Sequence, residues 1–207
     1  MTLRFTTLAL CCTAALAACS PQPAASDNHA ASAVAAAASE AGSVTIDTAR
    51  GEATVPANPE RIAVYDWGML DTLGKLGVDV GATTTNIRLG YLQDAARNMQ
   101  PVGTLFEPDY EALHAFAPQL IITGSRTAPA FEQLSKLAPT IEMTADTTKM
   151  RESTEARIDA FAKIFHKEAE AQALKKEIDE SFAAAKAAAQ GKGSGLVILV
   201  NGGKMSA

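Results

Sequence analysis

Short apolar runs alternate with stretches of helical periodicity between residues 44 and 146, and this alternation is the strongest constraint on the fold. Strand-like runs occupy residues 62–65, 78–83, 120–123 and 140–143. Between them, apolar side chains recur at the three- and four-residue spacing of amphipathic helices. Strands that read as continuous apolar runs are buried on both faces. The pattern therefore predicts an α/β lobe with a mostly parallel sheet covered by helices.

A small hairpin is predicted in front of this sheet. Residues 44–46 and 53–55 are extended runs that flank the turn-forming string Ala49-Arg50-Gly51. We therefore expect the first lobe, residues 44–146, to begin with this hairpin and to continue into the sheet.

The periodicity changes after residue 146. Residues 147–190 have no strand pattern, and two apolar stripes predict a long helical bridge of two helices, broken near residues 166–168. A helix of about twenty residues reaches roughly 30 Å, which is enough to cross the base of a lobe. Residues 196–200 then read as a buried strand, with nothing after it to cover its faces. We expect residues 191–207 to hold the first strand of a truncated second lobe.

The N-terminal residues read as an export signal. Arg4 precedes an apolar run that ends at Cys19, and the string Leu-Ala-Ala-Cys over residues 16–19 has the form of a bacterial lipobox. We expect a lipoprotein signal peptide over residues 1–18 and a lipid anchor on Cys19. A plain secretory signal followed by an unrelated cysteine is the alternative.

The segment after the lipobox reads as a spacer. Residues 19–43 are mainly Ala, Ser and Pro and cannot bury a core, so they predict a flexible, lipid-anchored tether. Cys11 and Cys12 would leave with the signal peptide and Cys19 would carry lipid, so no disulfide is expected. We expect the protein to lie in the cell envelope, facing the periplasm or the cell surface.

The composition argues against several classes of function. The net charge is −5 and no basic stripe is present, so nucleic acid is not an expected partner. His29, His114 and His166 are scattered, so no protein-built metal site is expected. Neither a Gly-x-Ser-x-Gly elbow nor a phosphate-binding glycine loop occurs, so we do not expect an enzyme. An envelope enzyme that uses Ser125 is the alternative from that class.

Several strings of the chain resemble one protein family. They are NPERIAVYD (58–66), VGTLFEPD (102–109), APQLIITGSR (117–126), APTI (138–141) and GGKMSA (202–207). In this order and spacing they resemble the periplasmic iron–siderophore-binding proteins of ABC importers, and among them the catecholate-siderophore branch. The resemblance covers the chain from about residue 44 to its end.

This resemblance implies two α/β lobes joined by one long helix, with the ligand in the cleft between them. It implies a ferric siderophore as ligand and an inner-membrane ABC permease as partner, and it implies that about a third of the family's length is missing. No cofactor is expected apart from the lipid on Cys19, and we expect a monomer.

A ferric catecholate complex is anionic, aromatic and rigid, so its pocket needs fixed positive charge and flat surfaces. Arg126 follows the predicted strand over residues 120–123 and matches the family's first cleft arginine. The alternative role of Arg126 is a surface salt bridge. Trp67 could instead be a core residue, and Arg88 could instead be a solvated surface side chain. The other predicted ligand-binding residues are Asp66, Asn86, Ser125, Lys204 and Met205.

Two further interpretations remain open. Haem or cobalamin could replace the siderophore, because the first lobe does not exclude them. Alternatively the product could be a non-functional remnant. In that case its unpaired strand should make it aggregate, or leave a frayed end after about Gly191.

Overall fold

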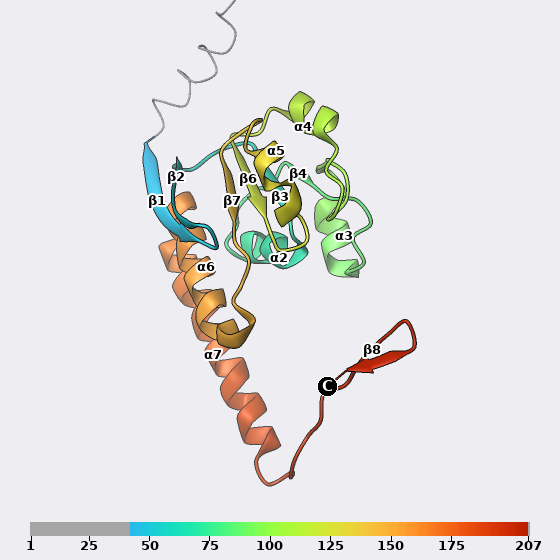
Figure 1. Cartoon of the computed structure of the whole chain (residues 1–207). Coiled ribbons are helices and arrows are strands. Elements are labelled where there is room, and N and C mark those ends of the chain that lie inside the picture. The colour runs from blue at the N-terminus through green and yellow to red at the C-terminus, as the bar shows by residue number, and fades with distance from the viewer. Residues whose placement is uncertain (1–41, 207) are drawn as a thin grey trace, which may run out of the picture.

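The computed structural model describes residues 42–206. The predicted signal peptide over residues 1–18, the predicted lipid on Cys19 and the tether as far as residue 41 lie outside the described residues. Within the described part, no helix is long and apolar enough to cross a membrane. This part forms an α/β lobe that is preceded by one β-hairpin and followed, after a pair of helices, by another (Figure 1).

A five-stranded sheet forms the centre of the lobe. Its strands are β3 (Ile62–Tyr65), β4 (Ala82–Thr83), β5 (Gln100–Pro101), β6 (Leu120–Thr123) and β7 (Thr140–Glu142). They lie in the order β5-β4-β3-β6-β7, and every neighbouring pair is parallel. The chain thus builds outward from β3 to β5 and then returns to the other side of β3. The predicted parallel α/β sheet is confirmed.

Helices cover both faces of this sheet. They are α2 (Trp67–Lys75), α3 (Gly90–Ala96), α4 (Tyr110–Phe116), α5 (Phe131–Leu134), α6 (Met150–Phe165) and α7 (Glu168–Ala189), with the 3-10 turns η1 (Ala128–Ala130) and η2 (Thr147–Lys149). The buried side chains of α2, α3 and α6 join one apolar cluster, and those of α4 and α5 join a second.

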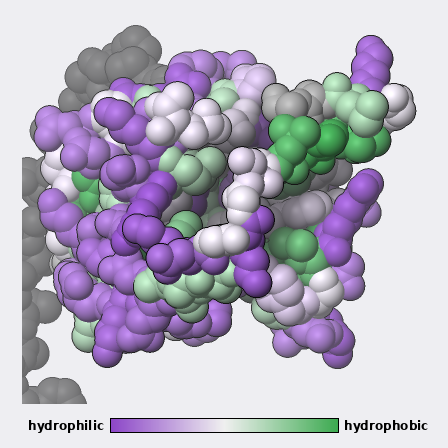
Figure 2. Space-filling model, turned by 90° about the horizontal axis from the view of Figure 1, so that it is seen from below, coloured by the Kyte–Doolittle hydropathy of each residue, from purple (hydrophilic) through white to green (hydrophobic). Residues whose placement is uncertain are grey.

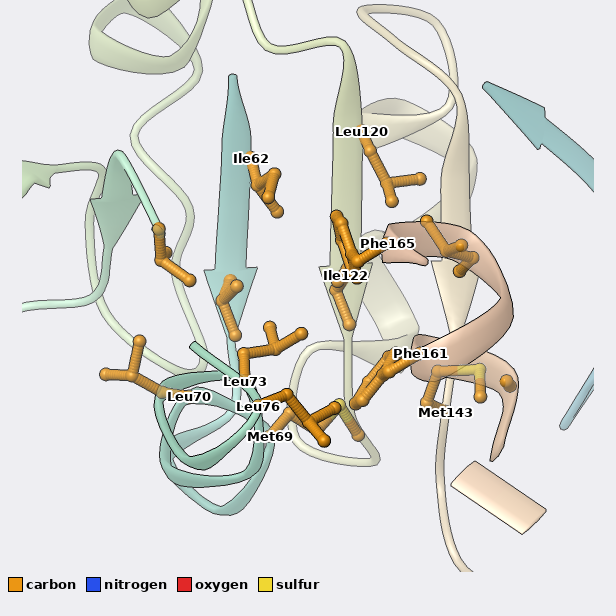
Figure 3. Close-up of a cluster of buried hydrophobic side chains, with 14 of the residues drawn as sticks. Ile62, Met69, Leu70, Leu73, Leu76, Leu120, Ile122, Met143, Phe161 and Phe165 are labelled. Carbon is orange, nitrogen blue, oxygen red and sulfur yellow. The ribbon is translucent and has the colours of Figure 1, made fainter. Parts of the chain in front are cut away.

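The central strand explains why two clusters form. Successive side chains of a strand point to opposite faces, so Ile62 and Val64 enter the first cluster whereas Ala63 and Tyr65 enter the second. Figure 3 shows the first cluster, in which side chains from α2 and α6 meet those of β3 and β6. A strand buried on both faces needs apolar residues at every position, and β3 has them.

The two helices after the sheet form an antiparallel pair. Lys175 of α7 pairs with Asp159 of α6 at 2.5 Å, and Arg151 pairs with Asp179. The chain reverses at His166, which has a left-handed φ of 55°. The predicted break near residues 166–168 is confirmed. Helix α6 has 16 residues and packs on the sheet. Helix α7 extends away from the lobe (Figure 1).

Two hairpins flank these elements. The first, β1 (Ser43–Thr48) with β2 (Gly51–Pro56), is antiparallel as predicted. The second joins β8 (Leu199–Asn201) to β9 (Lys204–Ser206), and these strands pair with each other and not with the five-stranded sheet. The predicted strand over residues 196–200 therefore begins only at Leu199.

Two further elements differ from the sequence-based expectation. The strand predicted over residues 78–83 is reduced to Ala82 and Thr83, because Val78 and Val80 reach the core from an irregular segment after Gly77. Strand β5 was not predicted, since Gln100 and Pro101 are exposed and give no apolar run.

Tyr65 provides a test of the second cluster. The side chain is fully buried, and its hydroxyl donates a hydrogen bond to the carbonyl oxygen of Val102 at 2.8 Å. Burial raises the pKa of Tyr65, and the charges of Tyr110 and Asp109 raise it further. The folded chain therefore keeps the phenol neutral above about pH 10, where an unfolded tyrosine ionises, so the free energy of unfolding must fall as the pH rises through that range.

We expect Tyr65→Phe to lower the free energy of unfolding by about 1 kcal/mol at neutral pH, through the lost hydrogen bond. The same variant should lack part of the alkaline loss of stability that the unaltered chain shows. Urea unfolding at neutral pH and at alkaline pH measures both effects. Identical pH dependence in the two proteins would show that Tyr65 does not remain neutral in the folded state.

Gly103 provides a second test. Its φ is 100°, and a Cβ there would lie 2.4 Å from both the carbonyl oxygen of Glu107 and the amide nitrogen of Asp109. We expect Gly103→Ala to lower the free energy of unfolding by at least about 2 kcal/mol. Gly90→Ala is the matched control, because nothing lies within 4 Å of a Cβ at that position. Equal thermal stability of the two variants would contradict this assignment.

Candidate ligand-binding site

The carboxyl ends of β3 and β6 form the topological switch point of the sheet, which is where open parallel sheets bind ligands. Asp66 directly follows β3 and caps α2, since its Oδ1 accepts a hydrogen bond from the amide of Met69 at 3.0 Å. Gly124 directly follows β6, and a Cβ there would lie 2.6 Å from Oδ2 of Asp66. The two strand ends therefore meet in direct contact, and a side chain at position 124 would displace the carboxylate of Asp66.

Trp67 is fixed at this edge by two neighbours. Its indole Nε1 donates a hydrogen bond to the hydroxyl of Thr84 at 3.0 Å, just after β4. The ring is half-buried and packs against the first apolar cluster. One part of the ring therefore packs in the core, as the alternative role predicted. The rest of the ring is accessible at the carboxyl end of the sheet.

Arg126 and Ser125 lie in the turn that follows β6, and both are exposed. The turn is anchored by the next residue, Thr127, which is fully buried. The Thr127 hydroxyl lies 2.6 Å from the carbonyl oxygen of Leu105 and 3.3 Å from that of Tyr65. Three segments at the same edge are thus held together beneath an exposed guanidinium.

Among the residues that the structure describes, Arg126 forms no salt bridge, which was its alternative role. Across residues 42–206, the ion pairs of the lobe involve other cations, and no carboxylate pairs with Arg126 or Arg88. A guanidinium without a counter-ion at a strand end is suited to receive an anionic ligand.

Asn86 and Arg88 lie in the loop between β4 and α3, so they project from the same edge of the sheet. Asn86 has a left-handed φ of 61°, and both side chains are exposed. Ile87 between them is buried, and its carbonyl oxygen accepts a hydrogen bond from Nε2 of Gln93 at 2.5 Å. The loop is therefore anchored at its centre, with its two polar side chains directed outward.

Lys204 and Met205 are not brought into this edge by strand pairing. Both lie on β9, are exposed, and belong to the separate C-terminal hairpin. Figure 2 views the molecule from below, and strongly hydrophobic side chains gather to one side of an otherwise mostly hydrophilic face. The exposed apolar residues 196–200 are the longest such run of the described chain.

Two residues at or near the edge were missed by the sequence analysis. Phe106 is 68% exposed, and it follows Leu105, whose carbonyl contacts Thr127. An aromatic residue in a loop between a strand and the helix-capping Asp109 is the signal that could have revealed it. Such a ring offers the flat surface that an aromatic ligand needs.

Arg157 is the second missed residue. Its Nη1 donates to the carbonyl oxygen of Met143 at 3.4 Å, and its Nε is buried without a hydrogen-bond partner among the described residues. Burial lowers the pKa of Arg157, and the carboxylate of Asp66 raises it. Arg157 directly precedes Ile158, the first buried apolar residue of α6, and a charged residue beside an apolar stripe is the signal that could have revealed it.

Arg157 also lines a cavity of about 600 Å³ between the β1–β2 hairpin and α6. This cavity contains carboxylates as well as cations, among them Asp47 and Lys163, and Arg126 is not part of its wall. The switch point is the stronger candidate for the ligand site, because the exposed Arg126 lies there and both Trp67 and Phe106 lie on segments that are tied to it.

Metal ligands do not converge in the described chain. Within residues 42–206, no group of three or more His, Cys, Asp or Glu side chains could hold a metal ion. His114 lies on α4 and His166 at the end of α6, while His29 lies outside the described residues.

Comparison with known proteins gives consistent matches. A family model described as periplasmic binding protein matches residues 62–206. The petrobactin-binding protein YclQ of Bacillus subtilis is 38% identical over 157 residues, which are 74% of this chain and 50% of that protein. Its crystal structure superposes with a TM-score of 0.76 at 35% identity, covering 80% of this chain and 60% of that one.

A further solved structure is that of the periplasmic catecholate-siderophore-binding protein VctP from Vibrio cholerae. It has a TM-score of 0.71 and 29% identity, and the match covers 79% of this chain and 60% of that one. The chain thus spans about half the length of the curated relative YclQ and about three fifths of the solved structures. With the matched region starting at β3 and including every strand of the five-stranded sheet, the chain belongs to the periplasmic binding protein family.

Proposed function

We propose that this protein captures a ferric siderophore of the catecholate type for an ABC importer. The carboxyl edge of the five-stranded sheet forms one wall of the ligand site. The observation that carries the proposal is the exposed guanidinium of Arg126, which lies at the switch point without a counter-ion from the described residues. An anionic iron complex would supply the missing negative charge.

The aromatic side chains favour a siderophore with rings. The half-buried Trp67 and the exposed Phe106 lie on segments that are tied to the same edge through Thr84 and Thr127. A flat guanidinium and flat rings can both stack on catechol groups. In this arrangement the siderophore supplies the ligands of the iron, and the protein recognises the outer surface of the complex.

The comparisons support a siderophore over haem or cobalamin. The relatives described above carry the names of petrobactin and of catecholate siderophores, and another relative, YfmC of Bacillus subtilis, is named as an Fe(3+)-citrate-binding protein at 35% identity. Because the chain spans only part of these proteins, the ligand remains our proposal for this chain.

The remaining expectations belong to the same proposal. The protein would be held to the membrane by a lipid on Cys19, would face the periplasm or the cell surface as a monomer, and would deliver its ligand to an inner-membrane permease. The lipobox string over residues 16–19 supports the anchor.

Binding can be measured through Trp67, which is the sole tryptophan of the chain. The titration uses the chain from Ser20 to Ala207, which contains every described residue, and ferric enterobactin as the probe. We expect saturable quenching of the tryptophan fluorescence. We expect Arg126→Ala to weaken the affinity about ten- to a hundredfold, because a hydrogen bond to a charged group contributes about 1.5–3 kcal/mol.

Arg61→Ala is the matched control. Arg61 is exposed and immediately precedes β3, so the variant removes a guanidinium from the amino-terminal end of the strands, opposite the candidate site. Its affinity should change less than about twofold, since the charge lies far from the strand ends that bind. N-acetyltryptophanamide corrects for light absorbed by the iron complex. Folded protein that shows no saturable quenching, or equal losses in both variants, would refute the proposed site.

The anchor can be tested in a bacterial host. We expect the full chain to incorporate labelled palmitate and to sediment with membranes, and we expect Cys19→Ala to do neither. Cys12→Ala is the matched control, because it alters a cysteine inside the apolar run and should leave both labelling and sedimentation unchanged. Labelling that persists in Cys19→Ala would place the lipid elsewhere.

A further inference from the structure

The tip of the first hairpin contacts the sheet next to the candidate site. The amide of Ala49 donates to the carbonyl oxygen of Glu142 at 2.9 Å, and Nε of Arg50 donates to the Oε2 of the same residue at 2.7 Å. Glu142 is the last residue of β7 and is only 8% exposed. Its other oxygen accepts a hydrogen bond from the Thr144 hydroxyl at 2.8 Å. Both oxygens of this buried carboxylate therefore accept hydrogen bonds, one from Arg50 and the other from Thr144.

The guanidinium of Arg50 also contacts the segment that follows Arg126. Its Nη2 lies 3.5 Å from the carbonyl oxygen of Ala128 in η1, and its Cζ lies 4.1 Å from the ring centre of Phe131 in α5. Glu132 adds a weaker contact at 3.9 Å. One planar side chain thus joins the end of β7 to η1 and α5 at once, which a lysine could not do.

The contacted segment is continuous with the turn that presents Arg126. The amide of Thr127 donates to the carbonyl oxygen of Gly124 at 3.1 Å, and the amide of Ala130 donates to that of Thr127 at 2.9 Å. On the side of β3 this turn is held by the Thr127 hydroxyl, and on the side of β7 it is held by Arg50.

We propose that Arg50 is a positioning residue for ligand binding: it fixes the turn over residues 124–130 so that Arg126 is directed toward the ligand. This inference rests on the proposed function. Removing Arg50 would leave the buried carboxylate of Glu142 without its cation, and this lowers the free energy of unfolding. The effect of Arg50 on ligand binding comes from the geometry that it imposes on the turn over residues 124–130, which it contacts at the carbonyl oxygen of Ala128.

The test combines affinity with hydrogen exchange, using the chain from Ser20 to Ala207. We expect Arg50→Ala to weaken binding of ferric enterobactin about tenfold when Arg126 is present, and less than about twofold in the Arg126→Ala background. Without any ligand, the same variant should speed exchange of the Thr127 and Ala130 amides about tenfold. Exchange of the Leu113 amide, in α4, should not change.

Two variants separate positioning from general stability. Arg151→Ala removes a chemically matched arginine, which is 47% exposed against 42% for Arg50, pairs with carboxylates and lies 5.3 Å from the Phe182 ring. It should leave affinity and the two amides unchanged. Arg50→Lys keeps the charge beside Glu142 but not the contacts with Ala128 and Phe131. Its melting temperature should return to that of the unaltered chain, whereas its affinity should stay as low as that of Arg50→Ala.

The possible outcomes distinguish the positioning role of Arg50 from the proposed siderophore binding. Equal losses of affinity with and without Arg126, or unchanged exchange at Thr127 and Ala130, would overturn the positioning role while leaving siderophore binding intact. Absence of quenching in the unaltered chain would overturn the proposed function, and the positioning role with it.

Discussion

The pairing of β3 with β6 is the contact on which the rest of the lobe depends. Four residues of each strand lie in parallel register, and all eight are buried. The seven apolar side chains among them divide between two clusters, so the same pairing holds the helices on both faces. It also brings Asp66 against Gly124 at the point where the strand order reverses. The fold and the location of the site therefore follow from one strand pair.

The candidate site combines side chains that are fixed by hydrogen bonds with exposed arginines that form no ion pair among the described residues. Trp67 and Thr127 are fixed by hydrogen bonds to neighbouring segments, whereas Arg88 and Arg126 have no ion-pair partner among the described residues. Fixed groups lose little conformational entropy when a ligand binds, and this preserves more of the interaction energy as affinity. A rigid, anionic iron complex matches such a surface better than a flexible or cationic ligand would.

Much of this arrangement could be predicted from the sequence, and the remainder depends on tertiary contacts. The buried strands β3 and β6, the hairpin and the helix break near His166 follow from apolar periodicity and local turn signals. Strand β5 could not be predicted, because backbone pairing with β4 rather than apolar residues defines it. The roles of Arg50 and Arg157 were also invisible, since their partners lie 92 and 14 positions away along the chain. Arg126, in contrast, is where its strand predicted it, in an exposed turn after β6.

The contact between the hairpin tip and Glu142 has a consequence for how the lobe meets other chains. Strand β7 is an edge of the five-stranded sheet, and its backbone groups could recruit a strand from a neighbouring molecule. The Ala49 amide at the tip of the hairpin donates to the carbonyl oxygen of Glu142, the last residue of that edge strand. The opposite edge, β5, is only two residues long and ends in a proline. Both borders of the sheet are thus partly protected against strand addition, which disfavours the joining of neighbouring copies through their sheet edges.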